Sequence, residues 1–282
     1  MTFITSCSDK NKHVGERVSF WLGQEVTLPE NMLCLIKKDT VDIKAFDADY
    51  KIVVYIDSLG CTNCKMKLRE WTETMNLYNS APDTDIDLFM IINAKDVPSL
   101  QYILRTYDFE YPVLVDTLDS FRKTNGIEND ENFRTFLLDN DNKIVAIGSP
   151  VWNPNVRDFY KRTILGDSTD AEGDDIIYET PLHFMLGTSH RGQSESREFR
   201  IRNNSGDTLH VSGLIPSCEC VTAVTDKDSI APGERVIATV TLTPDSVFGQ
   251  QRRFVDLFFS EKEKPIRLKL TLLNTNNQNY EN

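Results

Sequence analysis

The sequence predicts two domains in succession, an α/β domain followed by an all-β domain. Residues 46–166 alternate apolar runs of strand length with apolar stripes at helical spacing, which is typical of an α/β fold. Residues 167–180 open with an acidic stretch that lacks apolar periodicity, as an exposed linker does. Residues 181–275 contain short alternating strands broken by turn residues, which favours a β-sandwich. With 282 residues, each domain has enough chain for its own core.

Residues 1–10 form a short N-terminal segment. Its first part is apolar and leads to a cysteine, and the residues after that cysteine are polar. Phe3-Ile4-Thr5-Ser6-Cys7 is followed at once by the polar stretch Ser8-Asp9-Lys10. This arrangement resembles the lipobox of bacterial lipoproteins, in which the cysteine becomes the lipidated first residue after cleavage. The resemblance implies that Cys7 carries a lipid and that the chain sits in the cell envelope, periplasmic or associated with the outer membrane. The alternative is a tail with an incidental cysteine.

Residues 11–45 are predicted to form an N-terminal β extension. Arg17-Val18-Ser19-Phe20-Trp21-Leu22 and Met32-Leu33-Cys34-Leu35-Ile36 are strand-like runs, separated by a stretch with Gly23 and Pro29. Cys34 lies inside an apolar run, so we expect a buried and unreactive thiol.

The elements of the α/β domain follow from apolar runs and helix signals. Two buried strands are expected at 52–56 and 88–92, a further strand at 113–116, and a hairpin from 136–138 and 144–147. Pro98 suits the first turn of a helix to about Tyr107, and Asn153-Pro154 starts one that ends near Gly166. One more helix is expected to begin at Cys61, because six residues share its buried face, namely Cys61, Cys64, Leu68, Trp71, Met75 and Tyr78.

The pair Cys61-Thr62-Asn63-Cys64 has the spacing of a redox dithiol. A cysteine at a helix N-terminus lies among free backbone NH groups, and the helix dipole stabilises its thiolate. Cys61 is therefore expected to be the attacking nucleophile and Cys64 the resolving thiol. Lys65 adds positive charge unless it is simply solvated. The alternatives are an inert local disulfide and a zinc site, although a zinc site needs a second close pair that Cys34 does not supply.

The surrounding blocks resemble those of TlpA-like thioredoxin-fold proteins. Residues 55–64, 111–116, 135–139 and 143–145 carry the resemblance, which covers roughly residues 46 to 163. It implies a thioredoxin-like fold and a dithiol at Cys61 and Cys64. Two positions depart from the family: Phe133 stands where a cis-proline usually helps to dock substrate, and Tyr55 stands where thioredoxin has a buried carboxylate.

The β domain, residues 181–275, carries a second cysteine pair. Its strands are expected at 199–202, 209–211, 236–242, 254–258 and 266–270, and residues 276–282 form a polar tail. Ser217-Cys218-Glu219-Cys220-Val221-Thr222, together with Ala231-Pro232-Gly233-Glu234, resembles a bacterial domain of unknown function marked by Ser-Cys-Gly-Cys-Thr. That domain is related to the ASPM/Hydin immunoglobulin-like group, which implies a fold rather than an activity.

Three interpretations of the second pair remain open. If both cysteines lie on one strand, both sulfurs project to the same face. Cys218 and Cys220 would then bind Cu(I), with His210 as a weak third candidate, or accept electrons from Cys61 and Cys64. The third interpretation is two reduced or locally oxidised cysteines at a strand end. The other histidines, His13, His183 and His190, show no ligand spacing and are expected at the surface.

Composition excludes some classes of function. A formal net charge of -12 disfavours nucleic acid as a partner, and no run of eighteen apolar residues predicts a spanning helix. No cofactor motif is recognised. The sequence thus leaves three hypotheses: an envelope thiol-disulfide oxidoreductase acting on protein thiols and disulfides, a non-catalytic envelope lipoprotein that binds a protein partner, and a copper-binding protein. Membrane contact is expected through the lipid anchor alone.

Overall fold

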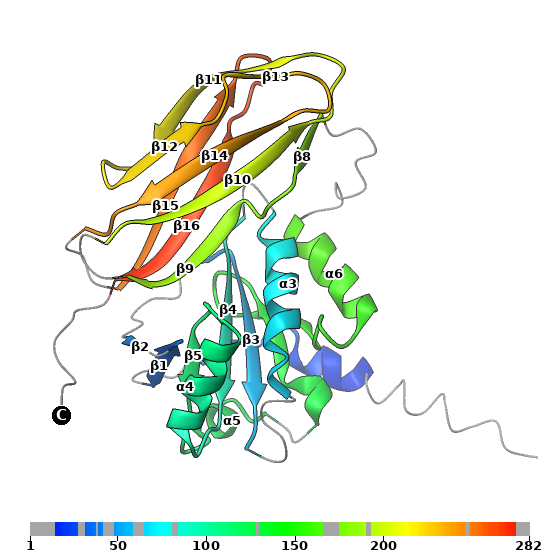
Figure 1. Ribbon diagram of the computed structural model, residues 1–282. Coiled ribbons are helices and arrows are strands. Elements are labelled where there is room, and N and C mark those ends of the chain that lie inside the picture. The colour runs from blue at the N-terminus through cyan, green and yellow to red at the C-terminus, as the bar shows by residue number, and fades with distance from the viewer. Residues whose placement is uncertain are drawn as a thin grey trace, which may run out of the picture.

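The chain folds into an α/β domain and a β domain that pack against each other (Figure 1). The computed structural model describes residues 15–27, 32–37, 39–41, 48–58, 65–80, 84–127, 130–165, 175–189, 193–245 and 249–274. The predicted lipidation residue Cys7, the linker stretch 166–174 and the tail from residue 275 lie outside these residues. No helix of the described residues has the length and apolar character needed to cross a membrane.

The α/β domain is built on a seven-stranded mixed sheet of order β2-β1-β5-β4-β3-β6-β7. Its strands are β1 (Leu33–Ile36), β2 (Asp39–Val41), β3 (Tyr50–Ile56), β4 (Ile86–Ile92), β5 (Val113–Val115), β6 (Thr135–Leu138) and β7 (Ile144–Ile147). The central strands β3, β4 and β5 run parallel, whereas β6 and β7 form the predicted antiparallel hairpin beside β3. Strands β3 and β4 are buried almost throughout because helices cover both faces of the sheet.

Helices divide between the two faces of this sheet. One face is covered by α3 (Leu68–Tyr78), α4 (Val97–Thr106) and α6 (Pro154–Leu165). The other is covered by a helix at residues 15–21 and by α5 (Ser120–Thr124). Alternate residues of β3 point to opposite faces of the sheet. Val54 packs in the core under α3, α4 and α6, and Val53 packs in the core on the other face.

The β domain consists of two sheets that enclose one apolar core. The four-stranded sheet has the order β12-β14-β10-β8, and the five-stranded sheet has the order β13-β11-β15-β16-β9. The strands are β8 (Ile176–Tyr178), β9 (His183–Ser189), β10 (Glu195–Asn203), β11 (Leu209–Pro216), β12 (Val221–Thr225), β13 (Ser229–Ile230), β14 (Arg235–Leu242), β15 (Gly249–Phe259) and β16 (Ile266–Asn274). Strand β14 shows the expected alternation of buried and half-buried residues.

A charged seam joins the two domains. We use this name for Asp85, Asp87 and Glu110 of the α/β domain with Arg197, Arg252 and Lys269 of the β domain. Lys269 Nζ lies 2.9 Å from Asp85 Oδ1, Arg252 contacts Asp87, and Arg197 lies 3.4 Å from Glu110. Apolar contacts add to the seam, because Met185 of β9 belongs to the core under α3.

The seam lies at the amino ends of the parallel strands. Asp85 and Asp87 stand at the start of β4, whereas Ile56 at the end of β3 pairs with Ile92 at the end of β4. A strand residue advances about 3.3 Å, so the carboxyl ends lie about 17 Å further along the sheet from Asp87. Figure 1 shows the β domain on the side away from the end of β3.

Three boundaries differ from the sequence-based expectations. Residues 15–21 are helical rather than extended. Residues 176–178 belong to β8 and pair with β10, so the linker predicted at 167–180 ends sooner. Lys67 has a left-handed backbone, with φ 48°, directly before α3, so no continuous helix runs from Cys61 to Tyr78.

Candidate active site at the dithiol segment

The dithiol occupies a segment whose two flanks are described. Residues 59–64, with Cys61 and Cys64, lie outside the described residues, so their pairing stays a prediction. On the amino side, β3 ends at Ile56 and is followed by Asp57. On the carboxyl side, the described chain resumes at Lys65, the residue after Cys64. Asp57 and Lys65 therefore mark the two described ends of the dithiol segment.

Four charged side chains connect these flanks, and we call them the flank cluster: Asp57, Lys65, Glu131 and Arg134. Lys65 Nζ donates to Asp57 Oδ1 at 2.7 Å, and Arg134 Nη1 lies 2.7 Å from Asp57 Oδ2. Lys65 Nζ also lies 3.2 Å from Glu131 Oε1. The Asp57–Lys65 pair brings together the two ends of the dithiol segment.

Burial makes part of this cluster electrostatically strong. Asp57 is 8% exposed and Arg134 6%, whereas the Glu131 side chain is 71% exposed and largely screened by water. Burial alone would raise the pKa of Asp57, but the hydrogen bond from Lys65 and the charge of Arg134 lower it. The hydrogen bond to Asp57 raises the pKa of Lys65. Asp57 and Lys65 are therefore both charged at neutral pH, and the Arg134 guanidinium lies beside the same buried carboxylate.

The two positions that depart from the TlpA-like pattern are both buried. Phe133 is 2% exposed, and the Arg17 guanidinium lies 3.9 Å from its ring centroid. No cis peptide bond occurs among the described residues, which include Phe133 and Arg134. The Tyr55 hydroxyl donates to Asp119 at 2.5 Å, and burial raises the Tyr55 pKa. Tyr55 is thus a neutral hydrogen-bond donor at the position where thioredoxin has a buried carboxylate.

Cys34 is buried, as its apolar surroundings predict. It lies in β1 with 1% exposure, and burial raises the pKa of its thiol to about 12. A thiol with this pKa is almost wholly protonated at neutral pH and therefore unreactive.

The second cysteine pair forms a disulfide. Cys218 and Cys220 are bonded to each other in a turn between β11 and β12, rather than projecting from one strand. His210 lies at the other end of β11, about 20 Å away at 3.3 Å per residue. Its Nδ1 lies 2.7 Å from Glu261. The structure therefore does not bring the three weak copper candidates together, and the described residues contain no cluster of three metal-ligating groups.

The described flanks of the dithiol segment lie at the opposite end of the α/β sheet from the β domain. Asp57 and Lys65 flank the dithiol segment at the carboxyl end of β3, while the β domain contacts the amino end of the sheet. The expectation that Cys218 and Cys220 accept electrons from Cys61 and Cys64 stays a prediction, because the dithiol lies outside the described residues.

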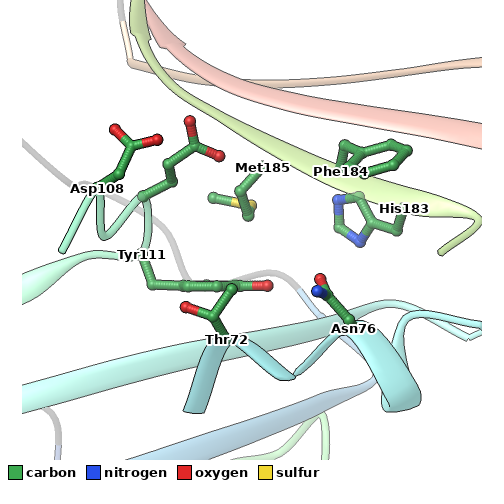
Figure 2. Close-up of a pocket in the computed structure, with 8 residues that line it drawn as sticks. Thr72, Asn76, Asp108, Tyr111, His183, Phe184 and Met185 are labelled. Atoms are coloured by element: carbon green, nitrogen blue, oxygen red, sulfur yellow. The ribbon is translucent and has the colours of Figure 1, made fainter. Parts of the chain in front are cut away.

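Two small pockets lie between the domains. One, of about 40 Å³, is shown in Figure 2, where Thr72 and Asn76 of α3, Tyr111, and His183 of β9 converge. The other, of about 190 Å³, lies among Asp85, His183, Arg252, Arg253, Phe254, Arg267, Lys269, Leu270 and Thr271. Ordinary small-molecule pockets measure roughly 300–1,000 Å³, so neither has the size of a metabolite site.

His183 lines both pockets and is not the surface residue that the sequence predicted. It is 2% exposed, and its Nε2 lies 2.7 Å from Thr271 Oγ1. Burial lowers its pKa to about 4, although Asp85 opposes that change, so the ring is neutral at pH 7. His183 is thus a buried structural residue beside the charged seam.

Comparison with known proteins finds a family match within the β domain. Residues 179–272 match the model of a family described as a protein of unknown function, DUF1573. No curated protein is significantly similar to the chain. The chain covers 44% of the length of a protein of unknown function from Porphyromonas gingivalis W83, with 15% identity over 30% of this chain and a TM-score of 0.27.

Two solved structures are similar over about half of the chain. A protein from Chlorobium tepidum described as a thiol:disulfide interchange protein, DsbE, has 15% identity and a TM-score of 0.38, covering 51% of this chain and 95% of its own. A protein from Aquifex aeolicus VF5 described as an electron transfer protein has 14% identity and a TM-score of 0.39, covering 52% of this chain and 99% of its own. These are weak similarities to proteins of a redox type.

Proposed function

We propose that this protein is a thiol-disulfide oxidoreductase of the cell envelope, with a thioredoxin-like α/β domain and an immunoglobulin-like β domain. Cys61 is the nucleophile and Cys64 the resolving thiol. The observation that carries the proposal is the flank cluster, in which Lys65 and Arg134 meet Asp57 at the carboxyl end of β3.

The sheet order supports the thioredoxin-like assignment. Parallel strands β3 and β4 are joined through the dithiol segment and α3, and the antiparallel pair β6 and β7 extends the sheet on the other side of β3. In this arrangement the dithiol segment follows a central buried strand. A carboxyl edge of parallel strands is where ligands and reactive groups of open α/β sheets are commonly found.

The reaction is a two-step thiol-disulfide exchange. The Cys61 thiolate attacks one sulfur of a protein disulfide, a mixed disulfide forms, and the other substrate sulfur leaves as a thiolate that takes a proton. The Cys64 thiolate then attacks the Cys61 sulfur and releases the second substrate thiol. The substrate gains two electrons, and Cys61–Cys64 becomes the disulfide. Lys65 and Arg134 favour the thiolate form through their positive charge.

Reduction of insulin by dithiothreitol tests the activity. The wild-type chain should accelerate the reaction, and Cys61→Ser should reduce the rate to that of dithiothreitol alone, because serine cannot form the mixed disulfide. Cys34→Ala is the matched control, since Cys34 is buried in β1. Equal rates for wild type and Cys61→Ser would exclude this function.

The second candidate is a non-catalytic module that binds a protein partner. It is favoured by the trans peptide bonds around Phe133 and Arg134, because the TlpA-like resemblance places a substrate-docking cis-proline there. Under this candidate Cys61 titrates near the ordinary thiol pKa of about 8.5, and iodoacetamide modifies it slowly at pH 6. Rapid modification at pH 6 favours the oxidoreductase instead.

The envelope location is proposed from the lipobox-like segment alone. Expressed from its own gene, the chain should incorporate a labelled fatty acid and sediment with membranes, because the lipid on Cys7 anchors it. Cys7→Ser should abolish both the label and the membrane association. Unchanged labelling of Cys7→Ser would overturn the anchor, without bearing on the redox activity.

A further inference from the structure

The disulfide Cys218–Cys220 closes an unusually short loop of the chain. Its two cysteines are two positions apart in the sequence. A disulfide stabilises a fold mainly by closing a loop in the unfolded chain, and this effect grows with the length of the loop. A three-residue loop is close to the minimum, so closing it contributes little to the fold. Stabilising the fold is therefore not the main role of the Cys218–Cys220 disulfide.

A guanidinium group is directed at one of the two sulfurs. Arg253 Nε donates to Cys220 Sγ at 3.3 Å, and Arg253 Nη2 lies 3.2 Å from Asp245. Both cysteines are half-buried at the margin of the β-domain core. A cation that contacts a sulfur stabilises its thiolate, and a thiolate of lower pKa leaves faster in disulfide exchange. Because Arg253 stabilises its thiolate, Cys220 is the better leaving group of the two cysteines.

The turn is held in place independently of the sulfur–sulfur bond. Ser217 N donates to Phe254 O at 2.9 Å, and Phe254 N donates to Ser217 Oγ at 3.0 Å. On the other side of the turn, Thr243 N donates to Cys220 O at 2.9 Å. These bonds fix both ends of the turn to β15 and to the end of β14, so the disulfide can open without loss of the fold.

We propose that Cys218–Cys220 is a second redox site, whose substrate is a reduced protein dithiol supplied by another molecule. A thiolate of that dithiol attacks Cys218 Sγ, a mixed disulfide forms, and Cys220 leaves as a thiolate beside Arg253. The second thiol of the substrate, after losing its proton, attacks its partner sulfur in the mixed disulfide and releases Cys218. The substrate is oxidised by two electrons, and Cys218 and Cys220 are reduced and take up the protons.

The test measures reduction of this disulfide in the full chain carrying Cys7→Ser, Cys61→Ser and Cys64→Ser. Dithiothreitol is the probe, and reduced cysteines are counted by iodoacetamide labelling and mass spectrometry at pH 7. Because the dithiol is absent, failure here is separate from failure of the proposed function. We expect reduction of the folded chain, and a rate roughly three- to tenfold lower after Arg253→Gln, since the leaving thiolate loses its cation.

The matched control is Arg235→Gln, at the far end of β14 and paired with Glu179. It should leave the rate unchanged. If Arg253→Gln does not fold, as judged by circular dichroism, Arg253→Lys replaces it. Lysine keeps the positive charge but lacks the Nε donor to Cys220, so its rate should still fall below that of the parent, by a smaller factor. A disulfide that resists dithiothreitol until the chain unfolds, or equal rates for the Arg253 and Arg235 variants, would overturn the proposal.

Discussion

Asp57 is the residue on which the flank cluster depends. It is 8% exposed and accepts from both Lys65 and Arg134. Asp57→Asn removes the nearest carboxylate of the buried Arg134 guanidinium and leaves it the exposed Glu131 at 3.8 Å, so we expect the free energy of unfolding to fall by about 3 kcal/mol. Urea denaturation at pH 7 measures it. Glu131→Gln is the control, because its exposed side chain should cost less than about 1 kcal/mol.

The same residue gives the stability a defined pH dependence. The pKa of Asp57 is lower in the folded chain than in the unfolded chain, where it is about 3.9. The unfolded state therefore binds the proton first as the pH falls, and the stabilisation is fully present above that value. The difference between wild type and Asp57→Asn should hold from pH 7 to about pH 5 and shrink below pH 4. A constant difference down to pH 3 would contradict the ion pairing.

Sequence reasoning reached some site residues and missed others for physical reasons. Cys34 could be predicted because its apolar neighbours in β1 determine its burial. Arg134 could not, because its contact with Asp57 joins residues far apart in the chain. His183 was also missed, since a single histidine carries no signal of the seam that buries it. The dithiol itself remains predicted from its spacing.

At the scale of elements, long apolar patterns were dependable and short mixed ones were not. The strands within β3, β4, β14 and β16 were predicted, and so were α4 and α6. The strand predicted at residues 17–22 was wrong. Strand alternation would place Ser19 on the same buried face as Trp21, but Ser19 is exposed while Trp21 is 5% exposed. With Val18 packed against the same core as Trp21, the buried residues follow a helical spacing rather than strand alternation.

Two further element errors have local causes. The left-handed backbone of Lys67 interrupts the apolar stripe that otherwise predicts a single helix. This conformation is costly for a residue with a side chain, and a sequence gives no sign of it at lysine. Strand β8 has only three residues and follows an acidic stretch, so pairing with β10 rather than local pattern determines it.

At the scale of the molecule, the seam should make the two domains unfold together. All three tryptophans, Trp21, Trp71 and Trp152, belong to the α/β domain, so their fluorescence reports that domain, while far-ultraviolet circular dichroism reports both. In urea the two signals should change at the same midpoint in the wild-type chain, because the domains share charged and apolar contacts.

Arg252→Met tests this coupling. It removes the cation that contacts Asp87, which is 4% exposed, so we expect a loss of about 3 kcal/mol and separate midpoints for the two signals. Arg200→Met is the matched control, since Arg200 pairs with Glu198 on an exposed part of β10. Coincident midpoints in Arg252→Met, at the position of the control, would show that the seam does not couple the domains.

The docking of the β domain at the amino ends of the parallel strands has a steric consequence. A macromolecule that binds near Asp57 and Lys65 contacts the α/β domain. A second macromolecule that binds the outer end of the β-sandwich lies on the opposite side of the molecule. Two macromolecules bound at these two places would not collide, because the length of the molecule separates them.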